Sequence, residues 1–211
     1  MQGPASAASN PLGQLAPGLG DVCGDYLTMY RAQLEGAVRA GAGGIDVAHR
    51  FSAALDGLLG ALYCAANAAA QNERRAPTGR VALVAVGGFG RGVVALHSDV
   101  DVLVLCDRPD DPHVSTLAEG FLYPLWDLGL SIGHAVRGVK ETLALARTDV
   151  RTATTLLDLR CVAGDRSIVQ ELHDACRQHV FEPALGNFIS ALRKDFDDRH
   201  ERFGGSLYLL E

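Results

Sequence analysis

The segment from Val81 to Cys106 constrains the fold more than any other, because it joins two apolar runs through a glycine-rich turn. It reads VALVAVGGFGRGVVALHSDVDVLVLC. The first run, Val81–Val86, is short, rich in β-branched residues and ends at glycine, which favours a buried strand over a helix. The second run, Val100–Cys106, has the same character and ends before Asp107-Arg108-Pro109. We therefore predict two buried strands with a glycine turn between them.

Two carboxylates, Asp99 and Asp101, open the second run. On a strand, residues spaced i, i+2 point to the same face, so the two acids are expected side by side. Like charges that close raise each other's proton affinity, and a divalent cation removes this conflict. Mg²⁺ typically binds one or two carboxylates together with substrate phosphates. The spacing therefore predicts a magnesium site.

The glycine turn before these acids is suited to phosphate. Gly87 and Gly88 lack Cβ, so their N–H groups can meet phosphate oxygens, and Arg91 can add a guanidinium. We also expect a short helix over 90–96, whose N-terminus would favour the same anion. A Walker A motif and a dinucleotide-binding G-x-G-x-x-G are both absent from the sequence. Together the turn and the acids predict a site for a metal-bound nucleoside triphosphate.

This segment resembles the nucleotidyltransferase superfamily that includes DNA polymerase β, and more narrowly the N-terminal part of bacterial PII uridylyltransferases. Further similarity lies in LGLSIGHAVR from Leu128, ATTLLDLR from Ala153 and RHERFG from Arg199. The resemblance covers roughly residues 21–211. In that family an HD hydrolase domain and paired ACT domains follow this region.

The resemblance implies an α+β fold with a polymerase β-like nucleotidyltransferase core, a small mixed sheet with helices. It implies UMP transfer from UTP, or another nucleoside triphosphate, to a tyrosine of the protein PII, with release of pyrophosphate. Asp99 and Asp101 would be the catalytic residues that hold Mg²⁺. Gly87, Gly88, Arg91 and Ser98 would bind the nucleotide. The family's Glu-Leu and proline positions in the turn carry Val93, Val94 and Leu96 here.

A third carboxylate, which the superfamily normally places on a later strand, is missing from the expected strand 131–137. Asp149 and Asp158 are possible substitutes, although each fits a helix cap or helix face. His134, on that strand, could face the acids, and His97 could approach the nucleotide from a loop. Two alternatives therefore stay open: a non-catalytic nucleotide-binding remnant or fragment, and a nucleotidyltransferase that uses ATP on another protein acceptor.

Periodicity and breakers predict the remaining organisation. We expect a disordered tail over 1–20, an N-terminal helical segment over 21–75, the nucleotidyltransferase core over 76–140 and a C-terminal helical segment over 141–211. The sheet is expected to have about four or five strands with helices mainly on one side. The expected helices are 22–40, 45–72, 113–128, 139–147, 149–161, 166–179 and 182–203.

The composition restricts which partners and which cellular compartment we expect for this protein. The net charge of −6 argues against a nucleic-acid substrate. Five cysteines without a C-x-x-C pair indicate reduced thiols in a cytoplasmic protein. The sequence has no charge-free window of about 18 apolar residues, so we expect no contact with a membrane.

Overall fold

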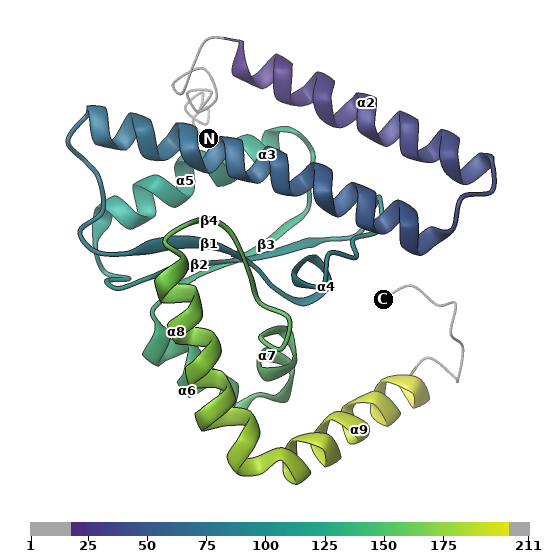
Figure 1. Cartoon of the computed structure of the whole chain (residues 1–211), viewed down its shortest axis with the longest axis vertical. Coiled ribbons are helices and arrows are strands. Elements are labelled where there is room, and N and C mark those ends of the chain that lie inside the picture. The colour runs from purple at the N-terminus through teal and green to yellow at the C-terminus, as the bar shows by residue number, and fades with distance from the viewer. Residues whose placement is uncertain (1–17, 203–211) are drawn as a thin grey trace, which may run out of the picture.

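A four-stranded mixed sheet forms the centre of the protein, seen in a computed structural model that describes residues 18–202 (Figure 1). The strand order is β3-β2-β1-β4. Strand β1 runs antiparallel to both β2 and β4, whereas β3 runs parallel to β2. The strands are β1 (Val81–Ala85), β2 (Val100–Cys106), β3 (Ile132–Arg137) and β4 (Arg160–Gly164). This mixed α+β architecture confirms the predicted fold class.

The two strands predicted around the glycine turn are present. All five residues of β1 are buried, and β2 is buried except at Asp101. A central position in the sheet explains this burial, because helices cover both faces of β1 and β2. The predicted strand 131–137 is also present as β3, within one residue of its expected start.

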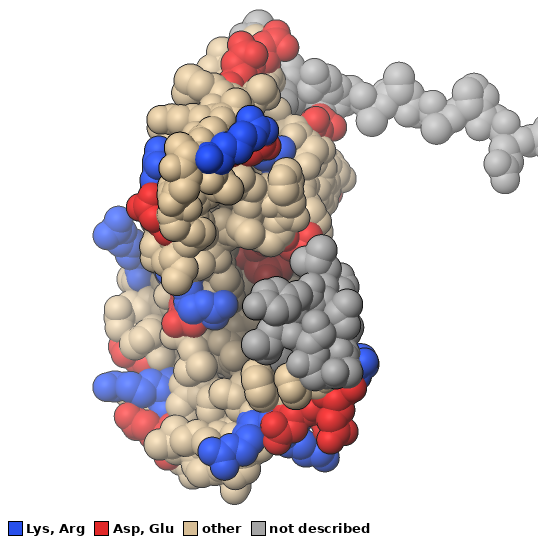
Figure 2. Space-filling view, turned by 90° about the vertical axis from the view of Figure 1, so that its right-hand side faces the viewer, with Lys and Arg blue, Asp and Glu red and all other residues tan. Residues whose placement is uncertain are grey.

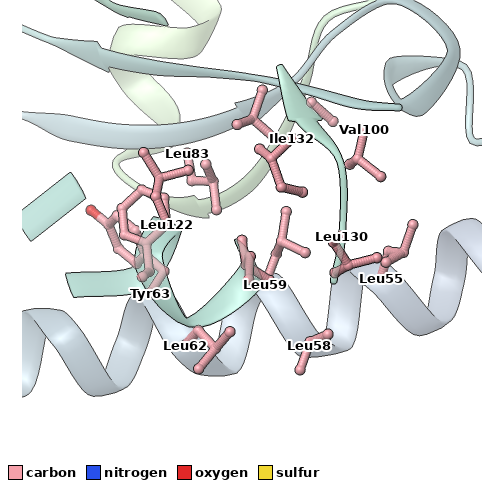
Figure 3. Close-up of a cluster of buried hydrophobic side chains, with 14 of the residues drawn as sticks. Leu55, Leu58, Leu59, Leu62, Tyr63, Leu83, Val100, Leu122, Leu130 and Ile132 are labelled. Carbon is pink, nitrogen blue, oxygen red and sulfur yellow. The ribbon is translucent and has the colours of Figure 1, made fainter. Parts of the chain in front are cut away.

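One face of the sheet packs against α3 (Gly44–Asn72) and α5 (Pro112–Asp127), and α2 (Leu19–Arg39) joins the same apolar cluster. Helix α3 lies directly on the strands, and α2 packs on its far side (Figure 1). Figure 3 shows Leu59 of α3 directed at the sheet near Leu83 of β1, and Leu55 lies one turn earlier on the helix. These three leucines have no measurable solvent exposure, which fixes α3 against the sheet.

Among the helices within residues 18–202, α3 alone is long and apolar enough to cross a membrane. Here its apolar residues form part of the core, with Phe51, Leu58 and Leu62 buried in the cluster that α3 shares with α2, α5 and the sheet.

The opposite face packs against α6 (Val139–Thr148), α7 (Val150–Thr155) and α8 (Arg166–Cys176). Ala82, Val84, Leu103 and Leu105 point to this side and join a second apolar cluster. The prediction that helices lie mainly on one side is therefore wrong. Strands buried on both faces require two helical layers.

The predicted helix 149–161 is also wrong in its second half. Helix α7 ends at Thr155, and the chain enters β4, which pairs with the free edge of β1. The short apolar run Cys161-Val162-Ala163 gains partners on β1 that local periodicity does not reveal. The sheet thus takes a strand from the segment that the sequence predicts to be helical.

The remaining helices follow the predicted ranges with changes in helix type. After α8 a π-helical turn covers Arg177–Phe181 and a 3₁₀ turn covers Glu182–Ala184, before α9 (Leu185–Arg202). The predicted tail over 1–20 lies outside the described residues up to position 17, and α2 begins at Leu19. The family-like segment after Arg202 also lies outside them.

Candidate active site

Asp101 is the one exposed position in an otherwise buried strand, and it lies beside the glycine turn. Its backbone carbonyl accepts a 3.2 Å hydrogen bond from the N–H of Val86, the residue immediately before Gly87. Because side chains alternate along a strand, Asp101 shares a face with Leu103, on the α6–α8 side of the sheet. Antiparallel pairing of β1 and β2 therefore brings the acid and the glycine turn together.

The two carboxylate oxygens of Asp101 lie between two glycines. A Cβ built on Gly87 would stand 3.7 Å from Asp101 Oδ2. A Cβ built on Gly133 would overlap Asp101 Oδ1, because Gly133 is the partner of Asp101 on β3. One oxygen therefore faces the glycine turn, and the other leans over the edge strand.

Asp99 precedes β2 in an exposed turn and acts on Asp101 through its charge. The pKa of the Asp101 carboxyl lies above its usual value, first because its carboxylate is partly desolvated by the surrounding protein and second because of the Asp99 charge. Acidic side chains are partly recessed near the middle of the face that Figure 2 shows. A cation would relieve this conflict, and a pair of carboxylates completed by phosphate oxygens suits Mg²⁺. The donor set therefore fits the predicted metal.

The glycine turn folds as a single helical turn, α4 (Gly87–Gly90), and not as the predicted helix over 90–96. Gly87 has a φ of 56°, a left-handed conformation that glycine adopts without strain. The N–H groups of the first residues in a helix have no acceptor in a preceding turn. Gly87 and Gly88 occupy those positions, so their N–H groups are available to phosphate oxygens.

Arg160, at the start of β4, ties this turn to the body of the protein. Its guanidinium donates to the carbonyl of Phe89 (3.0 Å) and to the Asp56 carboxylate of α3 (2.9 Å), and its Cζ stands 5.4 Å from the centre of the Phe89 ring. It also donates a longer 3.4 Å bond to the Gly90 carbonyl. Arg160 therefore fixes the carbonyl end of α4 and leaves the N–H end open.

Two further predicted nucleotide ligands lie close to the turn in sequence but differ in their contacts. Arg91 forms a 3.2 Å ion pair with Asp158, and one of its nitrogens would stand 3.9 Å from a Cβ on Gly88. Ser98 closes a turn by donating its hydroxyl to the Ala95 carbonyl at 3.1 Å. Arg91 thus lies next to the glycines predicted to bind phosphate, whereas Ser98 shapes the loop that leads to Asp99.

Neither substitute for the third carboxylate joins the acidic pair. Asp149 caps α7 by accepting from the N–H groups of Arg151 and Thr152, and the Thr152 hydroxyl lowers its pKa. Asp158 is held by Arg91. Within residues 18–202, no cluster of three or more acidic, histidine or cysteine side chains could hold a metal ion.

The two histidines considered from the sequence lie apart from the acids. His134 lies on β3 and pairs with Val102 of β2, so its side chain faces the side of the sheet opposite Asp101. Its ring packs 5.3 Å from the Trp126 ring. His97 is exposed in the loop after α4.

Three residues near the candidate site are not predicted from the sequence as site residues. Thr155 lies near Gly87, with its methyl group 3.8 Å from a Cβ built there. Arg160 and Gly133 have the roles described above. The motif from Ala153 to Arg160 resembles the family. Because the sequence predicts one continuous helix there, it does not reveal that the end of this motif turns back onto the glycine turn.

The mixed sheet, the glycine turn and the adjacent acids define a nucleotidyltransferase core of the DNA polymerase β-like class. By sequence, the chain is similar to a fragment of bifunctional uridylyltransferase/uridylyl-removing enzymes and spans about a fifth of the length of these relatives.

Three relatives illustrate the match. The protein of that name from Phenylobacterium zucineum is 36% identical over 213 residues, which cover 94% of this chain and 23% of the relative. Its counterpart in Caulobacter vibrioides is 36% identical over 172 residues, 81% of this chain and 18% of the relative. Its counterpart in Bradyrhizobium sp. strain BTAi1 is 37% identical over 166 residues, 78% of this chain and 18% of the relative. No family model matches the chain.

Proposed function

We propose that this chain catalyses Mg²⁺-dependent transfer of UMP from UTP to a tyrosine hydroxyl of a PII-type protein in the cytoplasm. The observation that carries the proposal is the position of Asp101, with one oxygen toward the glycine turn and the other toward the edge strand. The similarity to uridylyltransferases supports UTP as the donor. The free state of all five cysteines is consistent with a reducing compartment.

Each residue of the site has a role in this reaction. The N–H groups of Gly87 and Gly88 hold the triphosphate, and Arg91 adds positive charge beside them. Asp99 and Asp101 would hold the metal ion, which would supply neutralisation of the charge on the phosphate oxygens. Arg160 keeps the turn in place without touching the nucleotide.

The chemistry is an in-line substitution at the α-phosphorus of UTP. The tyrosine oxygen forms a bond to that phosphorus, the bond to the bridging oxygen of the β-phosphate breaks, and pyrophosphate leaves. The hydroxyl proton passes to solvent. Catalysis here consists of positioning and charge neutralisation, because no group of this chain needs to form a covalent bond with the nucleotide.

A second candidate is a nucleotide-binding protein without transfer activity. The observation that favours it is that neither Asp149 nor Asp158 joins the acidic pair. A third candidate is a transferase that uses ATP or another acceptor protein.

Incubation with radiolabelled UTP or ATP, Mg²⁺ and a purified PII-type protein separates the three candidates. We expect label on the PII-type protein from UTP, and none with the Asp99→Asn or Asp101→Asn variants. Mg²⁺-dependent UTP binding without transfer would support the second candidate. Transfer from ATP, or to a different protein, would support the third.

A further inference from the structure

Strand β3 is an edge strand and lies beside the candidate active site. It pairs only with β2 in the sheet order β3-β2-β1-β4. The other edge strand, β4, is separated from β2 by β1. The open edge of β3 is thus the sheet edge nearest to Asp101.

The backbone groups on this edge can be assigned from the parallel register. The N–H of Val100 donates to the carbonyl of Ser131 at 2.9 Å. Hydrogen-bonding direction alternates along a strand, so residues 131, 133, 135 and 137 turn toward β2. The N–H and C=O groups of Ile132, His134 and Val136 therefore point outward.

This edge lacks the usual protection against pairing with another chain. Edge strands are commonly shielded by proline, by charged side chains along the strand or by bulges. The sequence of β3, IGHAVR, contains no proline, and its one charged residue is Arg137 at the end. Gly133 and His134 are exposed. The strand is therefore a ready template for an added strand.

The site face of this edge is open in the direction of Asp101. Two strand spacings, about 10 Å, separate β2 from a strand added beside β3. Gly133 lies between them and has no side chain, so a long side chain from the added strand can extend across it. The Asp101 oxygen that leans over Gly133 marks where such a side chain would arrive.

An exposed aromatic group flanks the opposite side of the same edge. Trp126 and Tyr123 of α5 are 38% and 43% exposed, and their rings lie 5.4 Å apart. His134 packs against Trp126. Tyrosine and tryptophan supply much of the binding energy in protein interfaces, so this group can anchor the segment that pairs with β3.

We propose that an extended segment of the acceptor protein adds to the edge of β3, so that its acceptor hydroxyl passes over Gly133 to Asp101. This inference rests on the proposed function, since it names how that function's protein substrate binds. Main-chain hydrogen bonds would supply affinity, and the side chains on alternate faces would supply specificity.

The test removes one outward N–H from β3. In His134→Pro the lost N–H faces away from β2, so the native β2–β3 hydrogen bonds remain. His134→Ala is the matched control, because it removes the ring but keeps the N–H. We expect His134→Pro to raise the KM for a PII-type protein at least tenfold more than His134→Ala does, with unchanged binding of UTP and Mg²⁺. An unchanged KM for the acceptor in His134→Pro would overturn the proposal.

Amide hydrogen exchange of the wild-type chain keeps the test decisive if the proline variant unfolds. Adding the PII-type protein should slow exchange at Ile132, His134 and Val136. UMP transfer without this protection would refute edge pairing and leave the proposed function intact. Protection without transfer would support edge pairing and refute the proposed function. If the edge instead pairs with a second copy of the chain, sedimentation would show a dimer that His134→Pro dissociates, and the proposal would fail.

Discussion

The carboxylate of Asp101 lies over Gly133, with Oδ1 too close to the position of a Gly133 Cβ for both atoms to fit. We therefore expect Gly133→Ala to displace the carboxylate and to lower UMP transfer at least tenfold. Mg²⁺-dependent UTP binding should weaken in parallel, because the displaced acid is a predicted metal ligand. Gly186→Ala on α9 is a suitable control, since a Cβ there meets no atom within 4 Å. Full activity in Gly133→Ala would show that the position of Asp101 over this glycine has no functional role.

The raised pKa of Asp101 predicts a pH-dependent gain in stability when its charge is removed. The folded chain holds the Asp101 proton more tightly than the unfolded chain, so ionisation destabilises the fold as pH rises through the window between the ordinary and the raised pKa. We expect Asp101→Asn to melt at a higher temperature than wild type at pH 7 without metal. The difference should shrink as pH falls through the ordinary Asp pKa of about 3.9 and vanish well below it, where the wild-type acid is protonated in both states.

Thermal unfolding measured across this pH range, with Asp197→Asn on α9 as an exposed control, checks that prediction. A lower melting temperature for Asp101→Asn at pH 7 would contradict the claim that the ionised Asp101 carboxylate destabilises the fold. Added Mg²⁺ should stabilise the wild type and leave Asp101→Asn unchanged.

Arg160 should act as a positioning residue. Arg160→Ala removes the donors to the Phe89 carbonyl and to Asp56, and hydrogen bonds of charged groups contribute about 1.5–3 kcal/mol. We expect a rise in the KM for UTP with a smaller change in kcat, because the glycine turn loosens while the acids stay in place. Arg160→Lys should recover part of the stability but little of the KM, since one ammonium group cannot reproduce the planar set of contacts. An unaffected KM in Arg160→Ala would leave Arg160 with a structural role only.

Ser52 connects α3 to the loop that carries the acids. Its hydroxyl accepts a 3.0 Å hydrogen bond from the buried N–H of Val94. Ser52→Ala would leave that donor without a partner, at a cost of about 1–3 kcal/mol in the free energy of unfolding. Chemical denaturation should detect this loss, and Ser190→Ala on the exposed face of α9 should show little change. Equal stability of the two variants would contradict the importance of this contact.

The local pattern of apolar residues is sufficient to predict the two strands at the centre of this fold. Apart from Asp101, Val81–Val86 and Val100–Cys106 are apolar along their length because both faces of the sheet are covered, and that is visible in sequence. The acids and the glycines were predictable for the same reason, since a strand opening and a turn are short-range features.

Long-range pairing was not predictable in the same way. Strand β4 forms because β1 has a free edge, and the family-like segment at Ala153 bends to reach it. The contacts of Arg160 with Phe89 and Asp56 depend on that pairing. Gly133 was visible as a glycine in a strand, but its relation to Asp101 follows from the parallel register of β2 and β3.

Calorimetric titration of UTP tests the metal–nucleotide site most directly, comparing wild type with an Asp99→Asn, Asp101→Asn double variant in Mg²⁺ and in EDTA. An Asp197→Asn, Asp198→Asn double variant on α9 serves as the charge-matched control. We expect wild type and control to bind UTP only with Mg²⁺, and the active-site variant to bind at least tenfold more weakly. Equal UTP affinity in all three proteins, or binding unaffected by EDTA, would contradict the proposed site.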